Sequence, residues 1–304
     1  MSRLAIDAAL AGFGDEVGAE GPVAVEGGRT RWELGRGEGV EPRLVRAPSG
    51  IVEHLPAEMT VRVRAGTPVA ELDAALAEAG QRCALPDRGA GPAGPSTVGG
   101  AVMVGENHLH SLGRGRLRDS VLEVRYVSAE GKVIIGGGPT VKNVTGFDLP
   151  RLLTGSLGTI GLLGEVVLRT NPIPAAHRWV AVTDAEPRAV RRAVLRPGAI
   201  AWDGETAWVL LEGHEPDVEA GAAALALLGD VTDSDGPPAL PHRWSRTPAQ
   251  QYDSPGVHYL GTGVTVADQP DPNPPTVDPG AATVAARVVA NFDPTGRLNP
   301  QVSC

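Results

Sequence analysis

Residues 142–165, KNVTGFDLPRLLTGSLGTIGLLGE, decide how the rest of the chain is interpreted. Gly155, Gly158, Gly161 and Gly164 recur at every third position of a run that is otherwise mostly apolar. A buried strand needs no such glycines, and a glycine in a strand usually marks a bulge or the close approach of another backbone or a ligand. We therefore expect a core strand here whose glycines make room for a neighbouring segment or a ligand.

The composition is that of a folded chain with many turns. Hydrophobic residues make up 42% of the 304 residues and charged residues 21%, which is enough for one large domain or two smaller ones. Glycine and proline number 40 and 27, well above average usage, so we expect short elements joined by many turns. The net charge of −9 argues against a broad nucleic-acid-binding surface, which needs a basic stripe.

Compartment and metal content are indicated by what the sequence lacks. No apolar run approaches the length of a membrane span, and Asp7 comes too early for a signal peptide. The two cysteines, Cys83 and Cys304, form no CxxC pair, which argues against an iron–sulfur cluster or a cysteine zinc site. His108 and His110 have no adjacent third ligand, so we expect no metal site there. We expect a cytoplasmic protein without a membrane span of its own.

Two further glycine-rich motifs favour anion binding. The strand VAVEGG ends at Gly27 and Gly28, and paired glycines after a strand bring backbone N–H groups close to an anion. An ordinary hairpin turn is the alternative. In the second motif, residues 96–100, two hydroxyls stand beside two glycines, and these side-chain donors with unobstructed backbone N–H groups suit a pyrophosphate or the edge of a flavin. A glycine-rich surface loop is the alternative there, although a loop as long as residues 86–116 is uncommon unless functional.

The remaining pattern predicts an α+β fold with a small second module. Thr67 is expected to cap a helix that begins at Pro68, and two strands of a hairpin lie within residues 120–137. Composition shifts near Pro174, after which short strands and helices alternate. We therefore divide the chain into residues 1–174, a small α+β module at 175–267, and a proline-rich connector with a terminal helix and tail at 268–304.

These motifs, in this order, resemble those of the flavoprotein family of p-cresol methylhydroxylase and vanillyl-alcohol oxidase, the PCMH-type FAD-binding proteins. Residues 27–31, GGRTR, resemble the pyrophosphate loop, and residues 97–100, TVGG, the second flavin loop. Residues 118–131 resemble the strand pair that follows it. The opening stretch resembles the signature KNVAGYDL…GSLGTLGVI, and residues 292–300 resemble the terminal FDPxGxLNP. Within the family, the chain looks most similar to the FAD-binding subunits of bacterial glycolate oxidases.

The resemblance implies a two-subdomain PCMH-type FAD-binding domain with a small α+β cap, and non-covalently bound FAD. It implies an FAD-dependent oxidoreductase that serves as one subunit of a complex oxidising a 2-hydroxy acid such as glycolate or D-lactate. The implied partners are a catalytic flavoprotein subunit and an iron–sulfur electron-transfer subunit, through which any membrane contact would come. The residues that it assigns to FAD are Gly27, Gly28, Arg29, Thr30, Arg31, Thr97, Val98, Gly99, Gly100, Gly105, Arg118, Asp119, Asn143, Gly155, Gly158, Thr159, Ile160 and Asn299.

The first loop departs from the family pattern. Arg29 stands where the family has its third glycine, and an arginine is strained there if the position needs a positive φ. Arg29 or Arg31 could instead pair with a phosphate. Glu26 places a negative charge near that phosphate unless its side chain points away. Residues 26–31 therefore decide whether flavin binds.

The catalytic residues are less well marked. Oxidising a 2-hydroxy acid needs a base for the hydroxyl proton and a cation for the carboxylate. His258 is the best candidate for the base, with a hydrogen-bonded or solvated histidine of no catalytic role as the alternative. Arg178 and Arg243 are candidates for the cation, with ordinary surface arginines as the alternative.

Three functions fit the sequence. The first is a flavoprotein subunit that works beside the catalytic and iron–sulfur subunits. The second is an assembly subunit in which Arg29 and Glu26 have spoiled the loop, so that no FAD binds. The third is a stand-alone oxidase with its own substrate pocket under the cap. The absorbance spectrum of the purified protein separates the second function from the other two.

Overall fold

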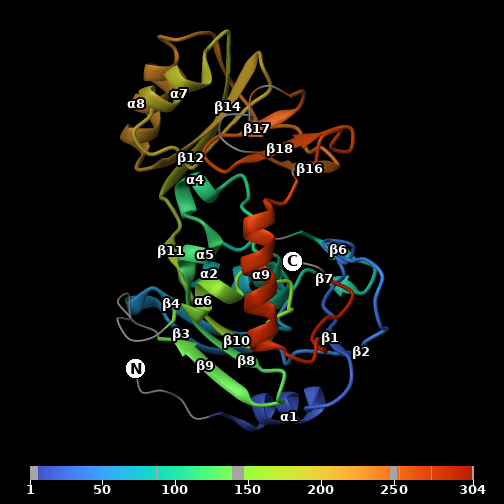
Figure 1. Cartoon of the computed structure of the whole chain (residues 1–304). Coiled ribbons are helices and arrows are strands. Elements are labelled where there is room, and N and C mark those ends of the chain that lie inside the picture. The colour runs from blue at the N-terminus through green and yellow to red at the C-terminus, as the bar shows by residue number, and fades with distance from the viewer. Residues whose placement is uncertain are drawn as a thin grey trace. The chain divides into compact units, whose positions relative to one another are not determined.

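The computed structural model describes residues 6–86, 88–138, 147–246, 252, 254–274 and 276–302. The chain divides into two compact units, which Figure 1 colours along the sequence. It enters the second unit twice, first for a short excursion at residues 107–116 that the sequence pattern does not predict. Unit 1 holds Met1–Glu106, Leu117–Asn171 and Val277–Cys304, and unit 2 holds Asn107–Arg116 and Pro172–Thr276.

Unit 1 is built around a five-stranded antiparallel sheet with the order β3-β4-β10-β8-β9. β8 and β9 form the hairpin that the sequence predicts, and β10 continues the glycine-rich stretch. The strands are β3 (Ile51–Leu55), β4 (Thr60–Arg64), β8 (Val121–Val127), β9 (Val133–Gly137) and β10 (Leu162–Arg169).

One face of this sheet carries the main hydrophobic core of unit 1. Four helices contribute buried residues to this core, and Val102 and Val166 within it are at most 1% exposed. Burial of such side chains is the dominant favourable term in folding. The helices are α2 (Val69–Glu78), α3 (Val98–Val104), α5 (Leu117–Ser120) and α6 (Leu149–Leu153).

α2 begins one residue later than the sequence predicts. Pro68 is its N-cap and makes no side-chain capping bond. Thr67, the predicted cap, instead accepts a hydrogen bond from the N–H group of Gly50 (2.8 Å) and donates to the carbonyl of the same residue (3.3 Å). The prediction is wrong because the hydroxyl is engaged by the loop before β3.

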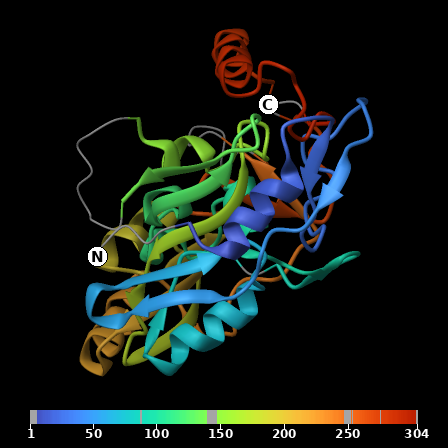
Figure 2. The ribbon, with the colours of Figure 1, turned by 90° about the horizontal axis from the view of Figure 1, so that it is seen from below.

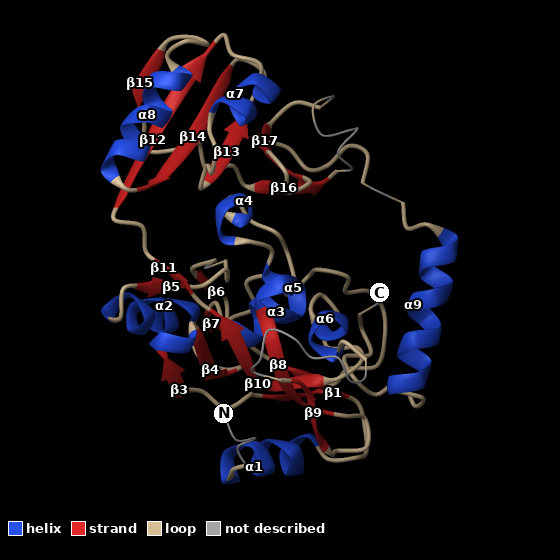
Figure 3. Ribbon diagram, turned by 90° about the vertical axis from the view of Figure 1, so that its left-hand side faces the viewer, coloured by secondary structure: helices blue, strands red, loops and turns tan. Residues whose placement is uncertain are grey.

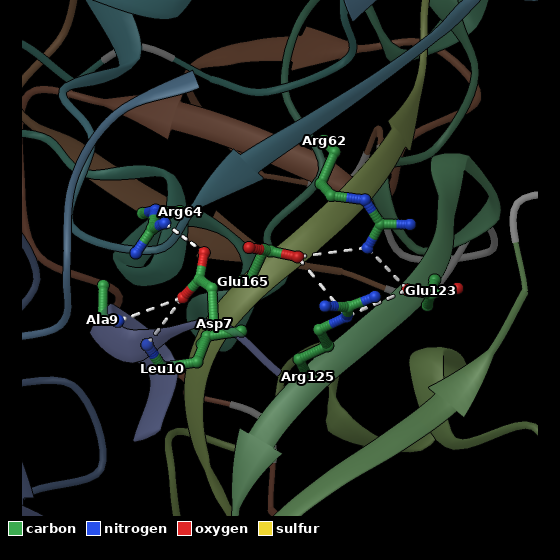
Figure 4. Close-up of polar contacts among 8 residues, drawn as sticks. All are labelled: Asp7, Ala9, Leu10, Arg62, Arg64, Glu123, Arg125 and Glu165. Carbon is green, nitrogen blue, oxygen red and sulfur yellow. Dashed lines mark hydrogen bonds and ion pairs between the residues drawn. The ribbon is translucent and has the colours of Figure 1, made fainter. Parts of the chain in front are cut away.

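The opposite face of the sheet carries buried charges. Arg62, Glu123, Arg125 and Glu165 are each at most 2% exposed. One oxygen of each glutamate contacts both arginines, at N···O distances of 2.6–3.4 Å (Figure 4). We call these four residues the charge cluster. Its two positive and two negative charges balance, and loss of one partner would leave an uncompensated charge in the interior.

α1 (Ala8–Val17) packs against β8, β9 and β10. Asp7 caps this helix by accepting hydrogen bonds from the N–H groups of Ala9 (3.1 Å) and Leu10 (3.0 Å). The carboxylate also pairs with Arg64 of β4 at 2.5 Å, which ties the start of the helix to the sheet (Figure 4). The hydrogen bond from Leu10 is the main cause that holds the pKa of Asp7 below its ordinary value.

Two structural features account for the four glycines of residues 142–165. Gly155 and Gly158 have φ angles of 86° and 80°, which residues with a Cβ rarely adopt, and they lie in the turns before β10. A Cβ on Gly161 would come within 2.3 Å of the Tyr126 ring, and one on Gly164 within 2.7 Å of a side chain of α1. The predicted close approach is confirmed at these last two positions, where the neighbours are side chains of β8 and α1.

A small parallel sheet and the C-terminal tail complete unit 1. β1 (Val23–Val25) pairs with β2 (Arg43–Val45), and Leu298 bridges to Val23. The tail follows α9 (Pro279–Phe292), and Figure 2 shows it in red beside the blue strands β1 and β2. Leu298 and Asn299 therefore lie beside the strand that leads into the first glycine loop.

Arg297 fastens this tail. It is 5% exposed, and it uses all five N–H donors of its guanidinium at donor–acceptor distances of 2.8–3.1 Å. The tail is thereby held against the end of α1 and the turn between β8 and β9. The acceptors are the carbonyls of Val17, Gly18, Glu20, Gly21 and Ala129.

Residues 86–116 are not the long loop that the sequence predicts. They contain the hairpin of β6 (Ala90–Gly91) and β7 (Gly94–Pro95), then α3 and α4 (Ser111–Arg114). Thr97 caps α3 by accepting a hydrogen bond from the N–H group of Gly100 at 3.2 Å. The pattern conceals α3 because glycine is a poor helix former.

The remaining short elements of unit 1 are η1 (Pro56–Glu58), β5 (Gln81–Arg82) and β11 (Asn171–Pro172). β11 pairs with β5 and runs into unit 2.

Unit 2 is an α+β module built on one seven-stranded antiparallel sheet, with the order β15-β12-β14-β13-β17-β18-β16 (Figure 3). α7 (Pro187–Ala193) and α8 (Glu215–Leu225) bury Val190 and Leu225 in its core. β17 and β18 form an antiparallel hairpin. The strands are β12 (Ala176–Thr183), β13 (Ala199–Trp202), β14 (Thr206–Gly213), β15 (Val231–Asp233), β16 (His242–Ser245), β17 (Val257–Tyr259) and β18 (Val264–Ala267).

Some sequence predictions concern residues that the structure does not describe, among them Asn143 and Cys304. Among the described residues, none of the helices is long and apolar enough to cross a membrane. The same residues contain no group of three or more histidine, cysteine or carboxylate side chains that could hold a metal ion.

Candidate cofactor site

The first glycine loop, α3 and the C-terminal tail surround a cavity in unit 1, which we call the loop cavity. Its space is about 720 Å³, part of it open to solvent. A second space of about 480 Å³ adjoins it and shares six of its lining residues. The loop cavity is lined by Val25, residues 27–32, Leu34, Arg36, Arg88, Ser96, Thr97, Gly100, Ala101, Met103, Val104, Leu157, Asn299 and Val302.

Backbone strain is concentrated at the loop cavity. Five described residues other than glycine have a positive φ, and three of these line the cavity: Arg29 (57°), Leu157 (54°) and Asn299 (48°). A left-handed backbone costs a residue with a side chain about 1–2 kcal/mol. Such strain persists where the surrounding structure enforces it, and it clusters at functional sites. The position of the third glycine does take a positive φ, and Arg29 adopts it.

The first glycine loop has unbonded amides. Among the hydrogen bonds of the described residues, none is donated by the backbone N–H groups of residues 27–31. The loop lies tightly against the β6–β7 hairpin, because a Cβ on Gly28 would come within 2.2 Å of the carbonyl oxygen of Pro95. Successive free N–H groups around a residue in the left-handed region form a concavity that binds anions. The hairpin-turn alternative does not account for this arrangement.

The charges around the loop cavity leave a positive excess. Glu26 pairs with Arg29 at 2.5 Å, and Glu106 pairs with Arg31 at 3.3 Å and with Arg88. Within the part of the chain that the structure describes, four arginines line the cavity and two glutamates pair with them, an arrangement that can complement a dianion such as a pyrophosphate. The four arginines that line the cavity are Arg29, Arg31, Arg36 and Arg88.

Glu26 does not present a free negative charge to the cavity. Its side chain is 15% exposed and contacts Arg29 at 2.5 Å and Arg46 at 2.9 Å. Burial opposes ionisation of this carboxyl, but the two arginines outweigh it and hold the pKa of Glu26 below its ordinary value. Because two guanidinium groups neutralise the carboxylate, the repulsion expected between Glu26 and a bound phosphate is offset.

The second glycine loop uses its amides internally. The N–H groups of Val98, Gly99 and Gly100 donate to acceptors within unit 1 at 2.7–3.2 Å, where the sequence predicts that they face a pyrophosphate. That expectation is wrong because these residues form the capped first turn of α3. This loop contributes the side chains of Ser96 and Thr97 to the wall of the cavity.

Asn299 is held in place with one polar atom unused. Its Nδ2 donates to the carbonyl of Leu157 at 2.6 Å, while its Oδ1 is buried and has no hydrogen-bond partner among the described residues. A buried acceptor without a partner costs about 1–3 kcal/mol. A ligand in the loop cavity that donates to Oδ1 would remove this cost.

The other residues that the resemblance assigns to FAD are spread more widely, and their roles stay predictions. Gly99 and Gly158 line the adjoining space. Asp119 pairs with Arg151, and Thr159 is 4% exposed with its hydroxyl donating to the carbonyl of Ser156 at 2.8 Å. The residues that line neither space are Val98, Gly105, Arg118, Asp119, Gly155, Thr159 and Ile160.

Sequence reasoning missed the aromatic part of the wall. The guanidinium carbons of Arg29 and Arg36 lie 4.5 Å and 3.9 Å from the centroid of the Trp32 ring, which is within the range of cation–π attraction. The spacing of two arginines around a tryptophan was the available signal. Arg88 and Leu157 gave no signal, because their place at the cavity depends on contacts far apart in the sequence.

The candidate base, His258, lies on β17 of unit 2. It is 1% exposed, and its Nδ1 is hydrogen-bonded to the hydroxyl of Thr265 at 2.9 Å. Burial lowers its pKa. These observations favour the alternative of a buried, hydrogen-bonded histidine, and its role as a base stays a prediction.

The candidate carboxylate binders are engaged within unit 2. Arg178 pairs with Asp233 at 2.7 Å and with Glu219 at 3.5 Å. Arg243 donates to the carbonyl of Asn107 at 3.0 Å. Neither arginine therefore stands out as a binder of a substrate carboxylate.

Comparison with known proteins finds similarity to an FAD binding domain and to glycolate oxidase subunits. Residues 18–137 match a family model described as an FAD binding domain, and this span includes both glycine loops. Glycolate oxidase subunit GlcE of Escherichia coli (strain K12) is 33% identical over 217 residues, which cover 68% of this chain and 60% of that protein. Glycolate oxidase subunit GlcD of Bacillus subtilis (strain 168) is 39% identical over 83 residues, which cover 27% of this chain and 18% of that protein.

The solved structures show the same fold at low sequence identity. An alkyldihydroxyacetonephosphate synthase superposes with a TM-score of 0.55 and 16% identity, covering 75% of this chain and 50% of that chain. This chain spans 60% of the length of the E. coli subunit, so it is compared with part of that protein. Residues 18–137 are therefore similar to an FAD binding domain, in agreement with the resemblance of the glycine-rich motifs.

Proposed function

We propose that this chain is the FAD-binding subunit of a flavin-dependent oxidase or dehydrogenase that acts on a 2-hydroxy acid such as glycolate or D-lactate. The loop cavity is the observation that carries the proposal. Three strained residues, the unbonded amides of residues 27–31 and an excess of positive charge meet there. A nucleotide ligand with a pyrophosphate accounts for all three features.

The residues present fit FAD. The amides of residues 27–31 and the guanidinium groups of Arg29 and Arg31 would hold its pyrophosphate. Thr97 would add its hydroxyl, and Asn299 would accept a hydrogen bond from the ligand through Oδ1. Bound FAD supplies the redox chemistry, and the chain's own residues bind and orient it.

The names of the relatives support a complex. GlcE and GlcD are both glycolate oxidase subunits. We infer that this chain works in the cytoplasm beside a catalytic flavoprotein subunit and an iron–sulfur electron-transfer subunit, with any membrane contact through these partners. In this arrangement unit 1 forms the FAD domain and unit 2 forms the cap.

An assembly subunit that binds no FAD is the second candidate, and one observation favours it. Arg29 and Arg31 are already paired with Glu26 and Glu106, so a phosphate must compete with these carboxylates. A stand-alone oxidase lacks comparable support, because His258 is buried and hydrogen-bonded.

The test is the absorbance spectrum of the purified full-length chain, followed by titration with FAD. We expect flavin absorbance as isolated, or saturable uptake of added FAD. Gly28→Ala should abolish uptake, because its Cβ would meet the Pro95 carbonyl oxygen at 2.2 Å. Gly12→Ala is the matched control, since nothing lies within 4 Å of a Cβ at that position. A folded, colourless protein that takes up no FAD would leave the assembly role as the answer.

A further inference from the structure

Unit 2 holds a cavity that nothing in the proposed function uses, which we call the α7 cavity. Its space is about 660 Å³, part of it open to solvent. Every residue that lines it belongs to unit 2. Arginines of α7 form one part of the wall, and Leu112, Leu260 and Tyr252 form another.

The charged part of the wall is unbalanced. Arg188, Arg191 and Arg192 are spaced three and four residues apart, so they share one face of α7. Among the described residues none of the three forms an ion pair, and the hydrogen bonds of Arg191 and Arg192 go to main-chain carbonyls. In the same unit Arg178 and Arg246 are paired with carboxylates. Three neighbouring arginines with no carboxylate partner among the described residues, on a chain of net charge −9, favour an anion from outside.

The rest of the wall is apolar and aromatic. Leu260 belongs to the hydrophobic core of unit 2, and Leu112 packs against it. The ring of Tyr252 lies edge-on to the ring of Trp202, with the centroids 5.6 Å apart and an angle of 78° between the ring planes. It also lies edge-on to the ring of His258, with the centroids 5.7 Å apart. Burial raises the pKa of Tyr252, so its phenol keeps its proton at neutral pH and can donate a hydrogen bond.

We propose that the α7 cavity binds a small organic acid with an apolar body. Its carboxylate lies between the guanidinium groups of Arg188 and Arg191, whose planar forks match a carboxylate in geometry and charge. Its apolar body lies against Leu112 and Leu260, where burial of apolar surface adds affinity. The proposal does not rest on FAD binding, because no residue of unit 1 takes part.

The first experiment uses three probes on the full-length chain. Phenylacetate carries both the carboxylate and the apolar body, phenylacetamide is its neutral analogue, and acetate lacks the ring. Ligand-observed NMR titration should give a dissociation constant on the order of 1 mM for phenylacetate, as expected for a ligand of this size. The other two probes should bind at least about tenfold more weakly. Equal binding of phenylacetamide, or no saturable binding of phenylacetate to the folded protein, would overturn the proposal.

The second experiment locates the site. The double variant Arg188→Gln/Arg191→Gln should raise the dissociation constant of phenylacetate at least about tenfold, because it removes both charged partners. Arg196→Gln is the matched control, an exposed arginine just beyond α7 that does not line the cavity. Trp202 reports on Tyr252, so its fluorescence should change on binding in the wild type and in Arg196→Gln. If Arg196→Gln weakens phenylacetate binding as much as the double variant does, or if the double variant binds phenylacetate as tightly as the wild type, the ligand lies elsewhere.

Discussion

Replacing Arg29 with glycine introduces the residue that the resemblance leads us to expect at this position, and it removes one charge from the loop cavity. If Arg29 holds the pyrophosphate, Arg29→Gly binds FAD more weakly than the wild type. If the arginine only spoils the loop, the variant binds FAD more tightly. The direction of the change in dissociation constant therefore separates an FAD-binding subunit from an assembly subunit.

The unliganded protein should tolerate this change. Glycine relieves about 1–2 kcal/mol of backbone strain at this position. The variant loses a partly exposed ion pair with Glu26, which contributes about 0.2–1 kcal/mol, and the contact with Trp32, which contributes about 0.5–1 kcal/mol. The greater freedom of glycine in the unfolded chain costs a further 0.5–1 kcal/mol, roughly. Because gains and losses nearly cancel, the free energy of unfolding should shift by less than about 2 kcal/mol.

FAD affinity should change more than stability. A hydrogen bond to a charged group contributes about 1.5–3 kcal/mol, so the dissociation constant should rise about 10- to 150-fold. The dissociation constant is measured by the quenching of flavin fluorescence when FAD is titrated with the protein. Arg46→Gln is the control, because it removes the other arginine from Glu26 without touching the cavity wall, and it should change the constant less than about fivefold. Unchanged or tighter binding by Arg29→Gly would refute the assignment of Arg29 to the phosphate.

Three further changes test the framework of unit 1. Glu165→Gln leaves an uncompensated positive charge in the charge cluster, so the free energy of unfolding measured with denaturant should fall by about 3–5 kcal/mol. The pair Arg125→Met/Glu165→Met should recover most of this loss, and a fully stable single variant would contradict the argument. Arg297→Met removes five hydrogen bonds, two of them fully buried, and should lower the free energy of unfolding by at least about 3 kcal/mol in the same measurement. An unchanged midpoint would show that other contacts hold the tail. The folded pKa of Asp7 is lowered, chiefly by the amide of Leu10, so its stabilisation is present above the unfolded pKa and is lost as the pH falls through the folded value. Asp7→Asn should therefore flatten the acid side of the stability–pH curve, and superimposable curves would contradict this role.

The features that the sequence predicts correctly are those set by local residue chemistry. The strand that the sequence predicts before Gly27 and Gly28 is β1, which ends at Val25. The glycine-rich stretch predicts close approaches, which Gly161 and Gly164 make. The hairpin of β8 and β9 follows from alternation of its residues around a turn.

The features that the sequence does not predict depend on distant contacts. Leu157 adopts a positive φ where its N–H group donates to the carbonyl of Met103 and its own carbonyl accepts from Asn299. No local pattern encodes these two partners. In the same way, Thr97 and the burial of Val102 stabilise α3 despite the glycines in its first turn. Tertiary packing overrides helix propensity there.

A crystal structure of the full-length chain grown with FAD tests the central claim most directly, that the loop cavity holds the cofactor. The account predicts pyrophosphate oxygens within about 3 Å of the amides of residues 27–31, and a ligand hydrogen bond to Oδ1 of Asn299. A flavin bound elsewhere on the chain, or a well-ordered loop cavity that stays empty at saturating FAD, would contradict it.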